Sequence, residues 1–189
     1  MSIVLQGSTS GSITLQEPAV AGSTVLSLPA VSGTILTTTS PKAGNVIQVV
    51  QGTSNTETGI TSGSATDTGL SVSITPTSSS SKILVLVTQE YLSVSPSAAT
   101  FFCGINIVRN STTIYSGNRS NGMGVVNGSG ITQLVTLGIF SMAYLDSPAT
   151  TSSTTYKTQA FNHTTGAGYA IYLQNNASPS YITVMEIAA

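Results

Sequence analysis

The stretch Leu70-Ser71-Val72-Ser73-Ile74, followed after a short turn by Lys82-Ile83-Leu84-Val85-Leu86-Val87-Thr88-Gln89-Glu90, decides the fold. In the first part apolar and hydroxyl side chains alternate, which is typical of a strand with one buried face and one solvated face. The second part is apolar at every position from 83 to 87, which predicts a strand buried on both faces. The Pro-Thr-Ser-Ser-Ser-Ser run between them predicts a turn. The pair therefore indicates a β-sheet protein.

Short β patterns continue on both sides of this pair, and no window of ten or more residues shows convincing helical periodicity. Arg109-Asn110-Ser111 separates two of the patterns and predicts a hairpin, whereas residues 117–130 are rich in Gly and Asn and predict an exposed loop. Eight or nine strands between residues 44 and 189 predict an all-β, jelly-roll-like antiparallel β-sandwich. The further strands are expected at Asn45–Gln51, Phe101–Val108, Thr112–Tyr115, Ile131–Leu145, Thr154–Asn162, Tyr169–Gln174 and Tyr181–Ile187.

The N-terminal part repeats itself, because Gly11–Ala21 and Gly22–Ser32 both read Gly-Ser-x-x-Leu-x-x-Pro-Ala-Val-x. Ser2–Gln6 is similar to Ser12–Gln16 and reads as an earlier, degenerate copy. So short a repeat cannot close a core within one chain, and such units are stable when neighbouring repeats or other chains cover them. We therefore predict an extended assembly and anchor segment over residues 1–40, a linker at 41–43 and a β-sandwich head over 44–189. The anchor contacts are expected from Ile13, Leu15, Pro18, Val25, Leu26, Leu28 and Pro29.

The chain has 189 residues, of which only 6% are charged and 40% are hydrophobic. An average soluble protein carries about 25% charged residues. Because so few charges leave little long-range repulsion, identical subunits can pack tightly against one another. The formal net charge is −1, and the basic residues stand singly, so a nucleic-acid partner is not expected.

The N-terminus has neither a basic start nor an apolar core region, so no signal peptide is expected. The longest strongly apolar run, Ile83–Val87, is far too short to cross a bilayer, and membrane insertion is not expected. We expect synthesis in the cytoplasm, with a final location set by assembly.

Catalytic chemistry finds little support in the sequence. His163 is the only histidine and Cys103 the only cysteine. A serine–histidine–aspartate site with Asp146 or Asp67 stays open, but no Gly-x-Ser-x-Gly motif occurs. The acidic residues are far apart in the sequence, so a glycosidase-type pair would have to be assembled by folding or subunit contact. Zinc and calcium sites are disfavoured, because His, Cys and acidic residues are scarce in the chain. No enzyme activity, catalytic residue, metal or cofactor is expected.

Loops rich in Asn, Ser, Gly and Tyr suit recognition of sugars, because amides and hydroxyls bond sugar hydroxyls and tyrosine rings stack on them. Solvated turns or contacts between subunits have the same composition, and we weigh this alternative slightly higher. The candidate receptor-contact residues are Asn118, Arg119, Asn121, His163, Asn175 and Asn176.

The repeat region, with its Pro-Ala-Val-Ala-Gly and Leu-Ser-Leu-Pro-Ala-Val-Ser-Gly-Thr-Ile-Leu motifs, resembles the N-terminal segments of tail-fibre and other virion appendage proteins of bacteriophages, especially marine and cyanobacterial ones. The stretches beginning at Asp67 (Asp-Thr-Gly-Leu-Ser-Val-Ser-Ile-Thr-Pro), Ser81 (Ser-Lys-Ile-Leu-Val) and Ile182 (Ile-Thr-Val-Met-Glu-Ile) resemble the C-terminal domains of the same proteins. The resemblance covers most of the chain.

The resemblance implies a homotrimer with a jelly-roll head, located in the virion and bound through residues 1–40 to a tail, baseplate or capsid protein. It also implies that the head can contact a host surface glycan. The chain departs from a typical tail fibre in size, because about 40 residues of anchor meet the head without a shaft. A short fibre or tail-tip appendage is therefore the main hypothesis, and a capsid decoration or head-fibre protein is the alternative.

Overall fold

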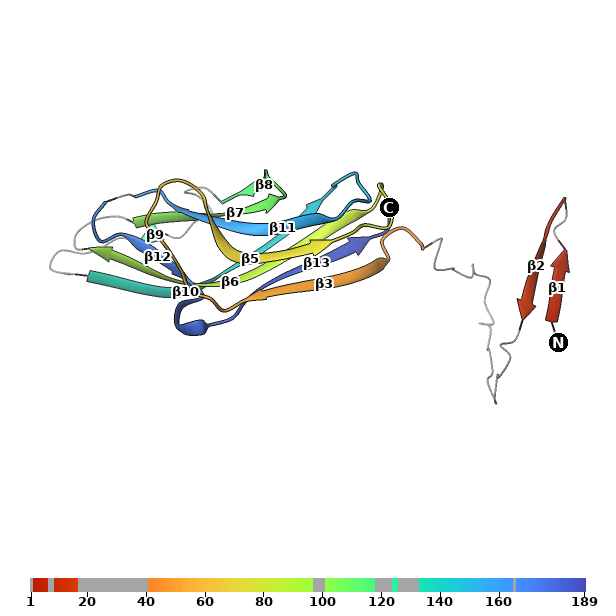
Figure 1. Ribbon diagram of the computed structural model, residues 1–189, viewed down its shortest axis with the longest axis horizontal. Coiled ribbons are helices and arrows are strands. Elements are labelled where there is room, and N and C mark those ends of the chain that lie inside the picture. The colour runs from red at the N-terminus through yellow and green to blue at the C-terminus, as the bar shows by residue number, and fades with distance from the viewer. Residues whose placement is uncertain are drawn as a thin grey trace. The chain divides into compact units, whose positions relative to one another are not determined.

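The structure, a computed structural model, describes residues 2–6, 9–16, 41–96, 101–117, 124–125, 133–164 and 166–189. The chain divides into two units, residues 1–36 and residues 37–189 (Figure 1). The described strands of the second unit are β3 (Val46–Ser54), β4 (Thr58–Ile60), β5 (Thr66–Ile74), β6 (Lys82–Pro96), β7 (Phe101–Arg109), β8 (Thr112–Ser116), β9 (Gly124–Val125), β10 (Gln133–Asp146), β11 (Thr154–Asn162), β12 (Ala170–Leu173) and β13 (Ser180–Ile187). A short 3-10 turn, η1 (Asn175–Ala177), precedes β13.

The head is a jelly roll, which confirms the sequence-based expectation. One sheet has the order β3-β13-β6-β10, and the other has the order β5-β11-β7-β8. All these pairs are antiparallel. If these eight strands are numbered along the chain, first pairs with last, second with seventh, third with sixth and fourth with fifth. This nested pairing, split between two packed sheets, defines the jelly roll. The short strands β4, β9 and β12 add to the sheet edges.

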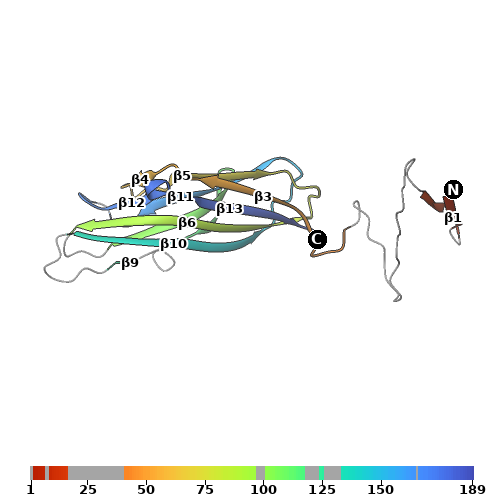
Figure 2. The same cartoon turned by 90° about the horizontal axis from the view of Figure 1, so that it is seen from below.

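Strand β6 has 15 residues, and this length lets it pair with three other strands of its sheet. Along one side it pairs with β10 over the full length of β10, and along the other it pairs first with β13 and then with β12 (Figure 2). The sequence-based prediction ended this strand at Glu90 and buried it on both faces, and both points are wrong. Strand pairing carries it on to Pro96. Only one of its faces points into the sandwich, where Ile83, Val85 and Val87 are buried.

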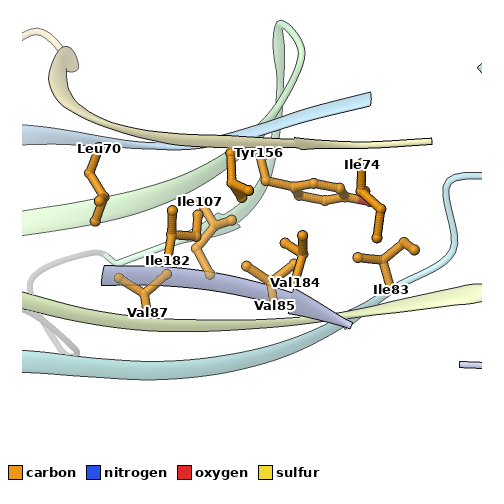
Figure 3. Packing of buried hydrophobic residues seen from close by; sticks show 10 residues of the cluster. Leu70, Ile74, Ile83, Val85, Val87, Ile107, Tyr156, Ile182 and Val184 are labelled. Carbon is orange, nitrogen blue, oxygen red and sulfur yellow. The ribbon is translucent and has the colours of Figure 1, made fainter. Parts of the chain in front are cut away.

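The core lies between the two sheets. Strand β5 alternates between buried and exposed residues, as its sequence predicts. One sheet contributes Leu70 and Ile74 of β5, Ile107 of β7 and Tyr156 of β11 to the core. These side chains face Val85, Ile182 and Val184 of the opposite sheet (Figure 3). A second cluster, which includes Cys103 and Ile171, continues the core towards the other end. Burial of each such side chain contributes about 1.5–3 kcal/mol, so this layer supplies the main stabilisation of the head.

The two sheets approach closely at Gly52 of β3. A Cβ atom at this position would overlap the carbonyl oxygen of Ser71 in β5. Glycine is therefore required by the space available, and it lets the first strands of the two sheets close one side of the sandwich.

The β7–β8 hairpin forms as predicted, and Asn110 occupies the turn with a positive φ of 53°. Asparagine tolerates this left-handed conformation better than most residues. Its backbone N–H donates to the carbonyl of Thr155 (2.7 Å), and its side-chain oxygen accepts from the N–H of Thr155 (2.9 Å). Strand β9 lies within the predicted loop 117–130, where it pairs with Phe101–Phe102.

The two ends of the head lie side by side. The N–H of Gly44 donates to the carbonyl of Ala188 (2.8 Å), and the N–H of Ala188 donates to the carbonyl of Asn45 (2.9 Å). The first and last strands, β3 and β13, are neighbours in one sheet, so this pairing continues their ladder to the ends.

In the first unit, β1 (Ser2–Gln6) pairs with β2 (Ser12–Gln16) as an antiparallel hairpin. The two similar copies noted in the sequence are therefore partners, with Ile3 opposite Leu15 and Leu5 opposite Ile13. Part of the segment predicted to be extended is thus a hairpin, since each copy supplies the other with backbone hydrogen bonds. Val4 and Leu5 are about half exposed.

A buried carboxylate, Glu186, holds β13 to β3 and to the turn before β6. Its oxygens accept from Gln48 Nε2 (2.6 Å), the Thr77 N–H (2.8 Å) and Thr77 Oγ1 (2.7 Å). Burial raises the pKa of Glu186, but hydrogen bonds from Gln48 and Thr77 outweigh it, so the pKa lies below its usual value. Folding therefore stabilises the ionised form of Glu186 relative to its protonated form.

We expect Glu186→Gln to lower the free energy of unfolding by about 1–3 kcal/mol at pH 7, because donors to the carboxylate lose an acceptor. In the unfolded chain a glutamate carboxyl has a pKa of about 4.3. The stabilisation from ionised Glu186 is fully present above that pH, and it is lost as the pH falls through the lower pKa that Glu186 has in the folded protein. The difference in unfolding free energy between the unaltered chain and Glu186→Gln should therefore become smaller below about pH 4. Urea unfolding at pH 7 and pH 3 measures it, with the exposed Glu57→Gln as control. A gap that is unchanged by pH would contradict this role.

Candidate functional site

The outer face of the β5–β11 pair is polar and suited to solvent. Asp67, Ser71 and Ser73 of β5 point outward beside Lys157 and Gln159 of β11. Asp67 accepts from Lys157 Nζ and from Gln159 Nε2, each at 2.7 Å. The bond from Lys157, then that from Gln159, lowers the pKa of Asp67. This sheet therefore has the usual division into a buried apolar face and a solvated polar one.

The outer face of the β6–β10 pair is different, because apolar side chains dominate it. Leu137 and Ile139 of β10 are 66% and 65% exposed. Their partners in the register are Leu92 and Glu90 of β6. We call this surface the apolar face, and its members are Leu84, Leu86, Leu92, Val94, Val135, Leu137, Ile139, Ala143 and Leu145.

A small hollow on the polar side of the head is lined by Asp67, Gly69, Leu70, Ser71, Lys157 and Thr158. Its volume is about 90 Å³. Pockets for small organic ligands span roughly 300–1,000 Å³. The hollow is therefore too small to enclose a sugar ring.

The predicted receptor-contact residues that the structure describes lie in two different surroundings. His163, exposed after the end of β11, packs edge-on against Phe161, with ring centroids 4.8 Å apart, and donates its backbone N–H to Phe102. Asn175 donates its side-chain Nδ2 to Glu57 (2.7 Å), and the adjacent Asn176 is exposed. His163 and Asn175 thus have different neighbours. Asn118, Arg119 and Asn121 lie outside the described residues.

Folding brings two carboxylates together that the sequence separates. Glu57 accepts from the Asn175 side chain, and Glu90 accepts from the Asn175 backbone N–H (3.0 Å). Burial and then the nearby Glu57 charge raise the pKa of Glu90, while the bond from Asn175 opposes them. The arrangement ties η1 to β6 and to the loop before β4. This convergence had no signal in the local sequence pattern.

The two aspartates considered for a serine–histidine–aspartate site have other partners. Asp146, almost fully buried, accepts from Arg109 Nη1 at 2.9 Å through both oxygens and from the Tyr156 hydroxyl (2.7 Å). Asp67 is bound by Lys157 and Gln159. In the described chain, His163 is a hydrogen-bond partner of neither, so the structure does not assemble this site.

The predicted anchor residues are described only in part. Ile13 and Leu15 belong to β2, and Pro18, Val25, Leu26, Leu28 and Pro29 lie outside the described residues. Within the described ranges, no group of three or more His, Cys, Asp or Glu side chains could hold a metal ion. Among the same residues, no helix is long and apolar enough to span a membrane.

No protein-family model matches the sequence, and no curated protein matches it. Among solved structures, the chain is similar to those of infectious bursal disease virus, Gt and Gx strains. The Gt match has 15% identity over 98% of this chain and 46% of that chain, with a TM-score of 0.35. The Gx match has 14% identity over 100% and 47%, with a TM-score of 0.36.

Latent PorU from Porphyromonas gingivalis has 13% identity over 78% of this chain and 14% of that chain, with a TM-score of 0.35. The chain therefore spans less than half the length of these structures. Because these TM-scores are low, the jelly-roll assignment rests on the strand order of the chain itself.

Proposed function

We propose that this chain is a non-enzymatic virion structural protein, a homotrimeric short phage fibre or tail-tip appendage anchored by residues 1–40. One observation carries the proposal: a jelly-roll head with its own core is joined to a repeat segment that has a two-stranded hairpin and exposed apolar side chains. A single hairpin is at best marginally stable in water. The segment therefore gains stability from other chains, which is the property expected of an anchor.

The experiment replaces Leu15 and Leu26, which occupy equivalent positions in the two repeats, by aspartate. Each buried leucine contributes about 1.5–3 kcal/mol, and a carboxylate at the same place would oppose burial. We expect the double variant to be absent from purified particles while the head stays folded. The control is Gln16→Asp with Ser27→Asp, one position later in each repeat. Normal incorporation of the leucine double variant would refute the anchor.

The place on the particle separates the two forms of this proposal. Labelled antibody against the head should bind at the tail if the protein is a short fibre or tail-tip piece. Labelling spread over the capsid would favour a decoration or head-fibre protein, for which the same anchor would serve.

A receptor role for the head rests on the exposed His163 and Asn176. A glycan array and a host-cell binding assay with the full chain test it, with His163→Ala and Asn176→Ala as variants. Binding that falls at least tenfold in either variant would support the role. Absence of binding by the unaltered chain would leave a purely structural part.

A further inference from the structure

We propose that the apolar face of the head, on β6 and β10, is the surface through which the three copies of the proposed homotrimer contact one another around a threefold axis. This inference rests on the proposed homotrimer and names the surface that holds its heads together.

The first argument is that both faces of these strands are apolar, whereas the sandwich buries only one. Strand β6 points Ile83, Val85 and Val87 into the core and presents Leu84 and Leu86 on the opposite face. Strand β10 likewise points apolar side chains both ways, with Phe140 and Met142 packed against the core. A continuous apolar run is typical of a strand covered on both sides. A layer that packs on the outer face of β6 and β10 must therefore come from outside the head sandwich.

The second argument is the contrast with the other sheet. The exposed positions of β5 carry Asp67, Ser71 and Ser73, which suit contact with water. The exposed positions of β10 include Val135, Leu137, Ile139 and Leu145. Both strands belong to the same head, so its overall composition does not explain the difference. Large exposed apolar patches of this kind mark interaction surfaces.

The third argument is size. Strand β10 has 14 residues and β6 has 15, and β13 and β3 continue the same surface with Met185 and Val49. At about 3.3 Å per residue and about 4.8 Å between strands, the outer face of the four strands projects to roughly 700 Å². A standard stable interface buries about 800 Å² per partner. One face of the head is therefore large enough for a stable contact.

The fourth argument is charge, and it favours a second copy of the chain over a charged partner. Lys82 and Glu90 are the charged residues of β6 on this face, and they carry opposite signs. Strand β10 ends in Asp146, which faces the interior and pairs with Arg109. Each face therefore carries little net charge, so the faces of several copies can converge with little like-charge repulsion.

The test measures how accessible the face is in the full chain. Ile139→Cys and Ser71→Cys place a thiol on the apolar face and on the polar face, in a chain whose single native cysteine is buried. We expect a maleimide reagent to modify the cysteine at position 139 at least tenfold more slowly than the one at 71. Adding Ser141→Arg, which puts a charge in the middle of the face without removing an apolar group, should abolish the protection. Ser71→Arg is its matched control and should leave the protection intact.

Mass from light scattering on the same proteins separates this inference from the proposed function. A three-chain mass with protection at position 139 supports both. A two-chain mass with protection overturns the homotrimer and makes the face a twofold contact instead. A three-chain mass with equal reaction rates at positions 139 and 71 would contradict the proposed contact surface but not the homotrimer. A single-chain mass with equal rates overturns both the face and the homotrimer, and would assign the face to a different partner. Circular dichroism on each variant confirms that the head is folded.

Discussion

Replacing Asp146 by asparagine is expected to lower the free energy of unfolding by about 3 kcal/mol, the lower end of the cost of breaking a buried ion pair. Asparagine has nearly the same shape and can still accept from the Tyr156 hydroxyl, but it no longer balances the Arg109 charge. The Arg109 side chain is 25% exposed, which lets water compensate part of the loss and places the effect at the lower end. Chemical denaturation of the full chain, followed by circular dichroism, measures it.

Two further variants identify the source of this effect. Tyr156→Phe removes one hydrogen bond and leaves the ion pair intact, so about 1–2 kcal/mol is expected. Asp67→Asn breaks the pair with Lys157 on the surface, where Asp67 is 55% exposed, and should cost less than about 1 kcal/mol. If Asp146→Asn cost no more than Asp67→Asn, the buried ion pair would not be important for stability.

The second large effect is expected from Ile107→Ala, with a loss of about 2–5 kcal/mol. Ile107 is completely buried in β7 and lies between the sheets near Ile182 and Val85 (Figure 3). Truncation leaves a cavity, because β7 is held by β8 on one side and β11 on the other and cannot move inward. The same denaturation experiment measures the change.

Thr113→Ala is the control for this variant, since Thr113 is exposed on β8, opposite Val108 of β7. A change within about 0.5 kcal/mol is expected there. A loss below 1 kcal/mol for Ile107→Ala would mean that the core relaxes around the missing atoms.

Local pattern was sufficient to predict the fold class and most strands. The alternation through β5 and the Asn110 turn each depend on neighbouring residues, and both were predicted correctly. Strand order depends on pairings between distant segments, such as β3 with β13, and has no local signal. The same holds for the end of β6, because the apolar run that guided the prediction ends at Val87, and beyond Glu90 the inward-facing positions include Ser93 and Ser95.

The candidate site was predicted less well than the fold, for a related reason. Glu57, Glu90 and Asn175 come from three separate segments, and only the folded sheet brings them together. The exposure of the β10 face was also unforeseen. A sequence shows that a strand is apolar on both faces, but it does not show whether the residues that pack against each face belong to the same chain.

The pairing of Gly44 and Asn45 with Ala188 at the ends of the head has a practical consequence for engineering. Because the two ends meet, a short linker could join them and new termini could be opened elsewhere, as in circular permutation. The bend at residues 147–153 between β10 and β11 is exposed over most of its length and is a suitable opening. Such a permutant would be the head alone, because the new linker takes the place of the connection from residues 1–43, and a cargo protein could be fused to either of its new termini.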